Sequence, residues 1–201
     1  MSVRRHVAIG CSVVAWACLA GDATSSQTQS ARPPAHLGIG RSATPADIAK
    51  LDIDIGSDGR GLPAGRGTVA EGEAIYAARC AVCHGRTGRE GPQDVLVGRE
   101  PRDGFPFGRD PALQKTIGNY WPYATTIYDY VRRAMPANAP GSLQDDDVYD
   151  VVAYLLFLNE LIPADAVIDR TSLPKIVMPA RDRFVVDPRG GPKQKPQRPA
   201  P

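Results

Sequence analysis

The chain has 201 residues, of which 42% are hydrophobic and 6% aromatic, a size that predicts one domain with extensions. Its 24 basic and 22 acidic residues leave a formal net charge of +2, which argues against a nucleic-acid partner. No apolar run reaches the ~18 residues of a membrane span. Most aromatic residues lie between positions 76 and 157, so the packed domain is expected around this region.

Residues 1–23 have the pattern of a secretory signal. Arg4 and Arg5 precede a mostly apolar run, and small residues follow from Ala20. A buried core helix and an uncleaved membrane anchor are the alternatives. Cys18 could be read as a lipidation site, although the bulky Trp16 is unusual there. We therefore expect an exported, periplasmic protein that is held at the membrane only if Cys18 carries a lipid.

Four further segments are expected after the signal. Residues 24–67 form a flexible or extended N-terminal arm, in which alternating apolar and acidic residues at 51–55 predict one short extended stretch. Residues 68–162 form the domain. Residues 163–186 have scattered apolar positions without a period, which indicates an ordered C-terminal arm wrapped on the domain. Residues 187–201 are rich in proline and lack aromatic residues, a composition typical of disorder.

The first helix of the domain is marked by a capping box. Thr68 is the expected N-cap, and Glu71 stands three positions later. Gly72 and Tyr76 are four residues apart and therefore share one face of this helix. A glycine gap beside an aromatic ring suits close crossing by another helix.

Two more helices complete the domain. One is expected at about 123–134, ended by the proline that follows. The last is expected at about 143–160, with Ser142 and a run of aspartates at its start. Tyr154 or Leu155 of this helix is a candidate to pack against the glycine face of the first. Because no strand pattern between 68 and 161 is equally strong, we predict an all-α fold.

Cys80, Cys83 and His84 form the attachment pattern of a c-type haem. The spacing lets each sulfur add to one vinyl group of the macrocycle, and the histidine that follows becomes the proximal iron ligand. A structural zinc site would need a fourth ligand, and the only other histidine outside the signal is the distant His36. A redox-active dithiol and an ordinary disulfide are the remaining alternatives.

A haem iron with one histidine needs a sixth ligand or has a vacancy. Met135 and Met178 are the two methionines beyond the start of the chain, and each precedes a proline. Met135 lies between the last two expected helices, whereas Met178 lies in an irregular tail. We therefore predict Met135 as the distal ligand, with Met178 and a site without methionine as alternatives.

The stretches CAVCHG at 80–85, GP at 91–92 and RAMP at 133–136 resemble the class I c-type cytochromes. The resemblance implies a small all-helical fold wrapped around one covalent haem c. It also implies that the carbonyl of Pro92 accepts the Nδ1–H of His84, which fixes the imidazole tautomer.

A narrower resemblance rests on LDID at 51–54, GLP at 61–63, YWPYATT at 120–126 and LPKIVMP at 173–179. Together these stretches resemble the cytochrome subunits of molybdenum sulfite or sulfur dehydrogenases, including that of the Sox system. The Sox subunit carries two haems, whereas this chain has one CxxCH and is expected to be a single-haem relative.

These features predict a periplasmic electron-transfer protein rather than an enzyme, with no catalytic residues of its own. With His84 and Met135 both bound, the iron has no open site for substrate. The expected partners are a periplasmic dehydrogenase of the molybdenum sulfite or sulfur type and a downstream electron acceptor. The alternative is a haem enzyme or ligand-binding sensor, peroxidase-like, with a labile methionine.

Two groups of residues near the motif, four arginines and five aromatic residues, also have predicted roles. The arginines at 86, 89, 132 and 133 could surround the haem edge with positive charge and steer an acidic partner; solvated or propionate-binding arginines are the equal alternative. The aromatic residues at 105, 107, 120, 121 and 123 are expected to form a wall of the haem pocket rather than an electron relay.

Overall fold

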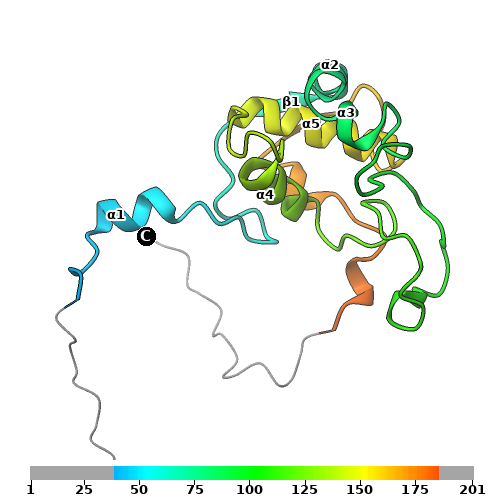
Figure 1. Cartoon of the computed structure of the whole chain (residues 1–201), viewed down its shortest axis with the longest axis horizontal. Helices are drawn as coiled ribbons and strands as arrows, with labels where there is room; N and C mark the ends of the chain where they lie inside the picture. Colours follow the sequence, from blue (N-terminus) through cyan, green and yellow to red (C-terminus); the bar gives the residue numbers. More distant parts are fainter. Residues whose placement is uncertain (1–38, 186–201) are drawn as a thin grey trace, which may run out of the picture. The chain divides into compact units, whose positions relative to one another are not determined.

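The computed structural model describes residues 39–185, so the predicted signal, Cys18 and the predicted tail at 187–201 lie outside the described residues. The elements are α1 (Pro45–Leu51), β1 (Arg66–Thr68), α2 (Val69–Arg79), α3 (Ala81–His84), α4 (Ala124–Ala134), α5 (Asp145–Leu158) and β2 (Val167–Asp169), with 3-10 turns η1 (Pro106–Gly108), η2 (Leu173–Lys175) and η3 (Arg181–Arg183) (Figure 1). This part of the chain is therefore helical, with two short strands. No helix of this part of the chain is long and apolar enough to cross a membrane.

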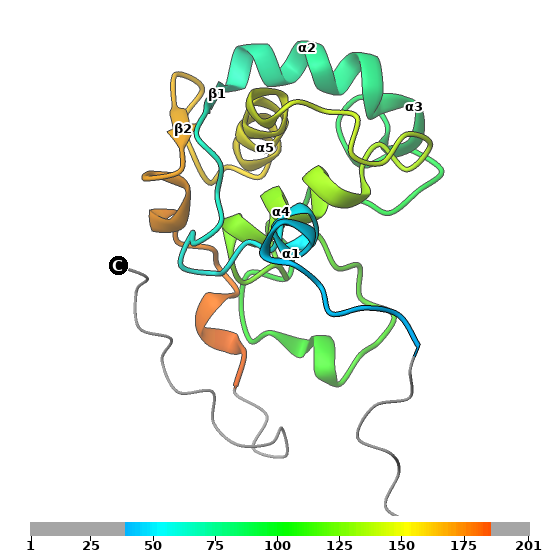
Figure 2. The ribbon, with the colours of Figure 1, turned by 90° about the vertical axis from the view of Figure 1, so that its left-hand side faces the viewer.

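The domain is organised around the crossing of α2 and α5 (Figure 2). A Cβ atom at Gly72 would overlap the carbonyl oxygen of Asp150, so only glycine allows the two backbones to approach this closely. The ring of Tyr76 lies 5.3 Å from that of Tyr154. The face predicted from the glycine and the tyrosine is confirmed, and Tyr154 is one of its partners.

The start of α2 confirms Thr68 as the N-cap and adds a feature that the capping box does not predict. The Thr68 hydroxyl accepts from the Glu71 amide at 3.1 Å and donates to the Glu71 carboxylate at 2.9 Å. The Thr68 amide does not bond Glu71. It donates instead to Asp150 Oδ1 of α5 at 2.7 Å. The cap of one helix is thus completed by a carboxylate of the other.

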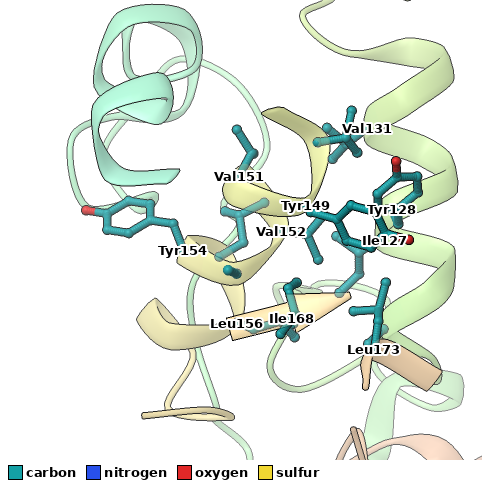
Figure 3. Close-up of a cluster of buried hydrophobic side chains, with 14 of the residues drawn as sticks. Ile127, Tyr128, Val131, Tyr149, Val151, Val152, Tyr154, Leu156, Ile168 and Leu173 are labelled. Carbon is teal, nitrogen blue, oxygen red and sulfur yellow. The ribbon is translucent and has the colours of Figure 1, made fainter. Parts of the chain in front are cut away.

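α5 is the helix around which the core is built. Residues 148–156 are all buried, and the rings of Tyr128 on α4 and Tyr149 on α5 lie 4.4 Å apart (Figure 3). Its N-cap is Gln144, which forms a capping box with Asp147, rather than the expected Ser142. The helix therefore begins two residues later than predicted, because a residue closer to the aspartate run can make both capping bonds.

The core extends into both arms that flank the predicted domain. Ile55 and Leu62 before it, and Ile168, Leu173 and Met178 after it, belong to one buried cluster with α4 and α5. β1 and β2 pair antiparallel. Sequence patterning missed this pairing because three-residue strands are too short to display an alternation.

The N-terminal arm also contains a helix, α1, which overlaps the extended stretch expected at 51–55 at its first residue only. α1 begins with a capping box between Thr44 and Asp47 and ends at Leu51. Residues 52–56, which have neither helix nor strand, follow it and include the buried Ile55. The prediction was wrong about residue 51, because the capping signal upstream outweighs the alternation.

Candidate functional site

The CxxCH motif occupies a tight turn directly after α2. The Cys80 amide donates to the Tyr76 carbonyl, ending α2, and the amides of Cys83 and His84 both donate to the Cys80 carbonyl at 3.1 and 3.0 Å. Both cysteines are free thiols. Side chains three residues apart on a helical turn lie on the same face, so the two sulfurs can bind one edge of a macrocycle.

The imidazole of His84 is held by a backbone carbonyl. Nδ1 lies 2.9 Å from the carbonyl oxygen of Asp94. A carbonyl oxygen only accepts, so Nδ1 carries the proton and the Nε2 lone pair is available for a metal ion. The donor set therefore fits a c-type haem: two unpaired thiols and one oriented imidazole.

The carbonyl that serves His84 is that of Asp94, not that of Pro92 as expected. The Gln93 amide donates to the Cys83 carbonyl at 3.0 Å, and a Cβ atom at Gly91 would overlap the same oxygen. These contacts bring the 91–94 loop against the motif. The loop turns so that the carbonyl of Asp94, two residues after Pro92, faces the imidazole ring.

Burial shapes the chemistry of Cys80. The side chain packs against the core, and removal from water raises the pKa of its thiol to about 11, with the Cys83 thiol adding to the effect and the Arg79 charge opposing it. The free thiol is therefore protonated at neutral pH. The exposed Cys83 is the more accessible of the two.

Tyr76 joins the motif to the helix crossing. Its hydroxyl donates to the Gly85 carbonyl at 3.0 Å, directly after the CxxCH turn. Burial raises the pKa of this phenol, so it remains a neutral donor. These contacts make Tyr76 a structural residue that links the helix crossing to the motif.

The two candidate methionines differ in environment. Met135 follows the last residue of α4, its amide donates to the Val131 carbonyl at 3.1 Å, and its side chain is only partly buried. Met178 is 1% exposed and belongs to the buried cluster. The Met178 side chain already serves as core packing, whereas that of Met135 is not enclosed.

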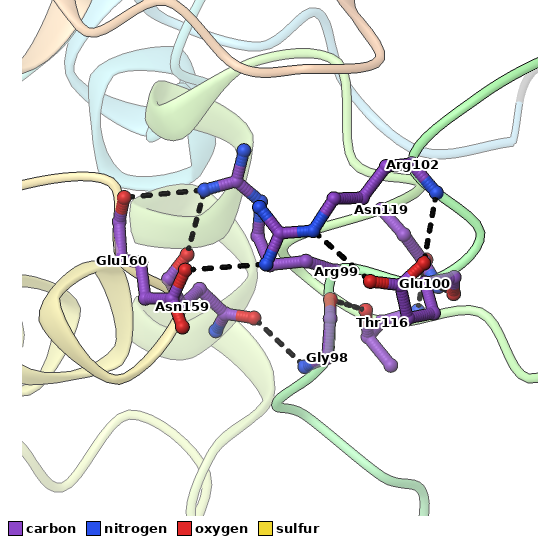
Figure 4. A network of polar contacts seen from close by, with 8 residues as sticks. All are labelled: Gly98, Arg99, Glu100, Arg102, Thr116, Asn119, Asn159 and Glu160. Atoms are coloured by element: carbon purple, nitrogen blue, oxygen red, sulfur yellow. Dashed lines mark hydrogen bonds and ion pairs between the residues drawn. The ribbon is translucent and has the colours of Figure 1, made fainter.

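A polar network that the sequence did not reveal anchors the loop at 96–119 to the end of α5 (Figure 4). The Asn159 side chain accepts from the Gly98 amide at 3.0 Å and donates to the Leu155 carbonyl at 2.9 Å. Arg99 donates to the carbonyls of Asn159 and Glu160. No motif marks a buried asparagine of this kind, so only the tertiary structure reveals it.

A cavity of about 310 Å³ lies beside this network. Its charged lining comes from Arg89, Arg99, Arg102, Glu100 and Glu160. Arg102 forms ion pairs with both glutamates, at 3.0 and 3.4 Å. The cavity is therefore polar, with much of its charge already compensated.

The predicted aromatic wall is divided between separate clusters. Phe105, Phe107 and Tyr120 pack with Phe184 of the C-terminal arm at centroid distances of 5.0 to 5.7 Å. Trp121 instead packs edge-on against Tyr130 of α4. The part played by Phe184 could not be expected, because this residue lies far along the chain from the others.

Two of the four arginines expected to steer a partner are already paired. Arg132 lies 3.0 Å from Asp145, and Arg133 pairs with both Asp54 and Asp129. The expectation that these two arginines offer free positive charge is therefore wrong. Arg86 and Arg89 are exposed.

A helical domain with a CxxCH turn at the end of its first packed helix, and an oriented histidine in that turn, has the arrangement of a c-type cytochrome. Residues 67–155 match the protein family described as cytochrome c oxidase, cbb3-type, subunit III. The crystal structure of the sulfane dehydrogenase SoxCD from Paracoccus pantotrophus contains a similar chain, with 39% identity and a TM-score of 0.65, covering 77% of this chain and 74% of that one.

A thiosulfate dehydrogenase from Stutzerimonas stutzeri (strain A1501) is 32% identical over 97 residues, which span 46% of this chain and only 28% of that protein. The chain belongs to the c-type cytochromes and resembles the cytochrome subunits of Sox-type sulfur dehydrogenases.

Proposed function

We propose that the protein is a periplasmic class I cytochrome with a single covalent haem c, and that it transfers electrons one at a time. The observation that carries the proposal is the CxxCH turn, in which two free thiols accompany an imidazole whose Nδ1 is bonded to the Asp94 carbonyl. When bound, the haem supplies a one-electron redox centre.

Each residue of the site has a defined task in this proposal. Cys80 and Cys83 would hold the macrocycle through thioether bonds. His84 would bind the iron through Nε2, while the Asp94 carbonyl keeps its ring in one orientation and raises its basicity. Met135 would supply the second protein ligand, which would close the iron to substrate and raise the reduction potential.

We further propose that the electron donor is a periplasmic dehydrogenase acting on a sulfur compound, a molybdenum enzyme of the sulfite or sulfur dehydrogenase type. The similarity to a chain of a sulfane dehydrogenase over most of both lengths supports this donor class. The cytochrome would pass each electron to a downstream acceptor without binding the substrate of the dehydrogenase.

One observation favours a second candidate. A relative is named as a thiosulfate dehydrogenase, although the chain spans little more than a quarter of it. In this case the protein would be a haem enzyme in its own right, or a sensor, with a methionine that leaves the iron. Carbon monoxide separates the two candidates: it binds a reduced iron that has a free coordination position, and it does not bind readily where a methionine holds that position.

The experiment that tests the proposal begins with the purified, matured protein. Acid–acetone should leave the haem on the polypeptide, whereas combined Cys80→Ala and Cys83→Ala should yield none. The reduced protein should neither bind carbon monoxide at once nor turn over thiosulfate or sulfite alone, and it should accept electrons from a sulfur-oxidising molybdenum dehydrogenase. Haem that is extracted by acid–acetone would contradict covalent attachment. Turnover of thiosulfate or sulfite without a partner would contradict the role as an electron carrier and support that of a haem enzyme.

A further inference from the structure

Residues 54–57, here called the strap, lie along α4 although they precede the cytochrome motif by more than twenty positions. Ile55 in the strap and Leu62 beyond it are buried in the same cluster as α4 and α5. The strap therefore belongs to the packed domain.

Three contacts join the strap to α4: Thr125 Oγ1 donates to Ser57 O at 3.4 Å, the Ile55 amide donates to Asp129 Oδ1 at 3.3 Å, and Arg133 Nη1 lies 3.1 Å from Asp54 Oδ1. The three α4 residues are spaced by four and form one stripe of the helix. The strap follows this stripe in the opposite direction, from the last turn of α4 towards its first.

The strongest part of this contact is at the end of α4. Arg133 bridges Asp129 of its own helix and Asp54 of the strap. The Asp129 side chain is only 15% exposed, and it also receives the Ile55 amide. A planar guanidinium can serve two carboxylates at once in a fixed geometry, which a flexible ammonium does less well.

This bridge lies two residues before Met135, which follows the last residue of α4. On the other side of the same turn, Arg132 lies 3.0 Å from Asp145 at the start of α5. The final turn of α4 is thus tethered from two directions, by the strap and by α5.

We propose that Asp54, Arg133 and Asp129 form a positioning network through which the N-terminal strap holds Met135 on the iron. The inference rests on the proposed role of Met135 as distal ligand. In this network the strap would limit how readily the thioether leaves the iron.

The test measures how readily cyanide displaces the thioether in the ferric holoprotein. Arg133→Gln should bind cyanide about fivefold more tightly than the wild type, the size expected of a partly exposed ion pair, and weaken the Fe(III)–thioether charge-transfer band. Asp54→Asn should act in the same direction. Arg133→Lys should raise cyanide affinity less than Arg133→Gln does. The free-energy change in cyanide binding of the double variant Arg133→Gln with Asp54→Asn should be smaller than the sum of the two single changes.

Asp52→Asn is the matched control, since this exposed aspartate on the same arm undergoes the same charge change. It should leave cyanide affinity unchanged. Equal affinities in the wild type, Arg133→Gln and Asp54→Asn would overturn the inference, and Asp54→Asn decides alone if Arg133→Gln fails to fold. If Met135→Ala leaves the thioether band in place, the ligand assignment fails; if it removes the band while the network variants change nothing, only the positioning role fails.

Discussion

The amide of Thr68, at the start of α2, donates a 2.7 Å hydrogen bond to the Asp150 carboxylate on α5. Asp150 is 6% exposed at the closest point of the helix crossing. Burial raises its pKa to about 6, and the nearby Glu71 charge adds to this, while the hydrogen bond from Thr68 opposes it. A carboxylate that completes a helix cap is therefore also a titrating group within the core.

This pKa predicts a pH dependence of stability. The folded-state value of about 6 lies above the ordinary 3.8, so the native state binds the proton more tightly between these pH values. The free energy of unfolding contributed by Asp150 is therefore full below pH ~4 and is lost as the pH rises through ~6, by about 1–2 kcal/mol after solvent screening.

Asp150→Asn keeps an acceptor for the Thr68 amide but cannot titrate. In urea unfolding of the holoprotein from pH 4 to 7, the free energy of unfolding of the variant should rise relative to that of the wild type up to pH ~6 and then stay level. Asp52→Asn, at an exposed position, serves as the control. Parallel profiles for Asp150→Asn and the wild type would mean that Asp150 does not titrate in this range.

A second prediction concerns the glycine at the same crossing. A methyl group at Gly72 would overlap the Asp150 carbonyl oxygen. Alanine favours a helix over glycine by ~1 kcal/mol, but the overlap forces the helices apart, and Gly72→Ala should cost a net ~2 kcal/mol or more in thermal unfolding. Gly108→Ala meets nothing within 4 Å and should be nearly neutral. Equal melting temperatures for both variants would contradict the crossing.

The two methionines should give opposite phenotypes. Met135→Ala should remove the thioether band and lower the reduction potential, with a modest effect on unfolding, because its side chain is only partly buried. Met178→Ala should keep the band but cost about 2–4 kcal/mol of stability, since it empties a buried position. Spectra, redox titration and urea unfolding of both variants separate the roles, and a lost band in Met178→Ala would reverse the assignment.

The agreement between sequence and structure follows the range of the interactions. The cap at Thr68 and the glycine face at Gly72 were predictable because both depend on residues within one or two helical turns. The choice of Asp94 over Pro92 was not, because it depends on how a short loop rotates against the motif. The residue types alone do not encode that rotation.

Long-range pairing explains the remaining differences. Arg133 pairs with Asp54, which lies 79 positions away. Because no local pattern shows this pairing, the sequence suggested that the positive charge of Arg133 was free to attract a partner. Met178 lies in an arm that the sequence indicates as wrapped on the domain, but without a period that shows which side chains face inward. The contact of η2 in this arm with α4, and the burial of Met178 in the shared cluster, carry no local signal.

The last prediction concerns Arg86 and Arg89, two exposed arginines that follow the motif. Arg86 and Arg89 follow the CxxCH turn directly, whereas Arg132 and Arg133 are held in ion pairs. Of these four arginines, only Arg86 and Arg89 lack a carboxylate partner among the described residues, so they can attract an anionic redox partner. Ferrocyanide should therefore reduce the ferric protein faster than a cationic reagent of equal driving force, and rising salt should remove the difference as the Debye length falls to ~8 Å and below.

Charge reversal gives the decisive comparison. Arg86→Glu with Arg89→Glu should slow ferrocyanide and accelerate the cationic reagent, with an unchanged reduction potential. Arg109→Glu with Arg170→Glu alters the net charge equally on other exposed segments and is the control. If both double variants change the two rates alike, only net charge matters. Steering at the motif would then be refuted, because a local field must depend on which arginines are reversed and not merely on how many.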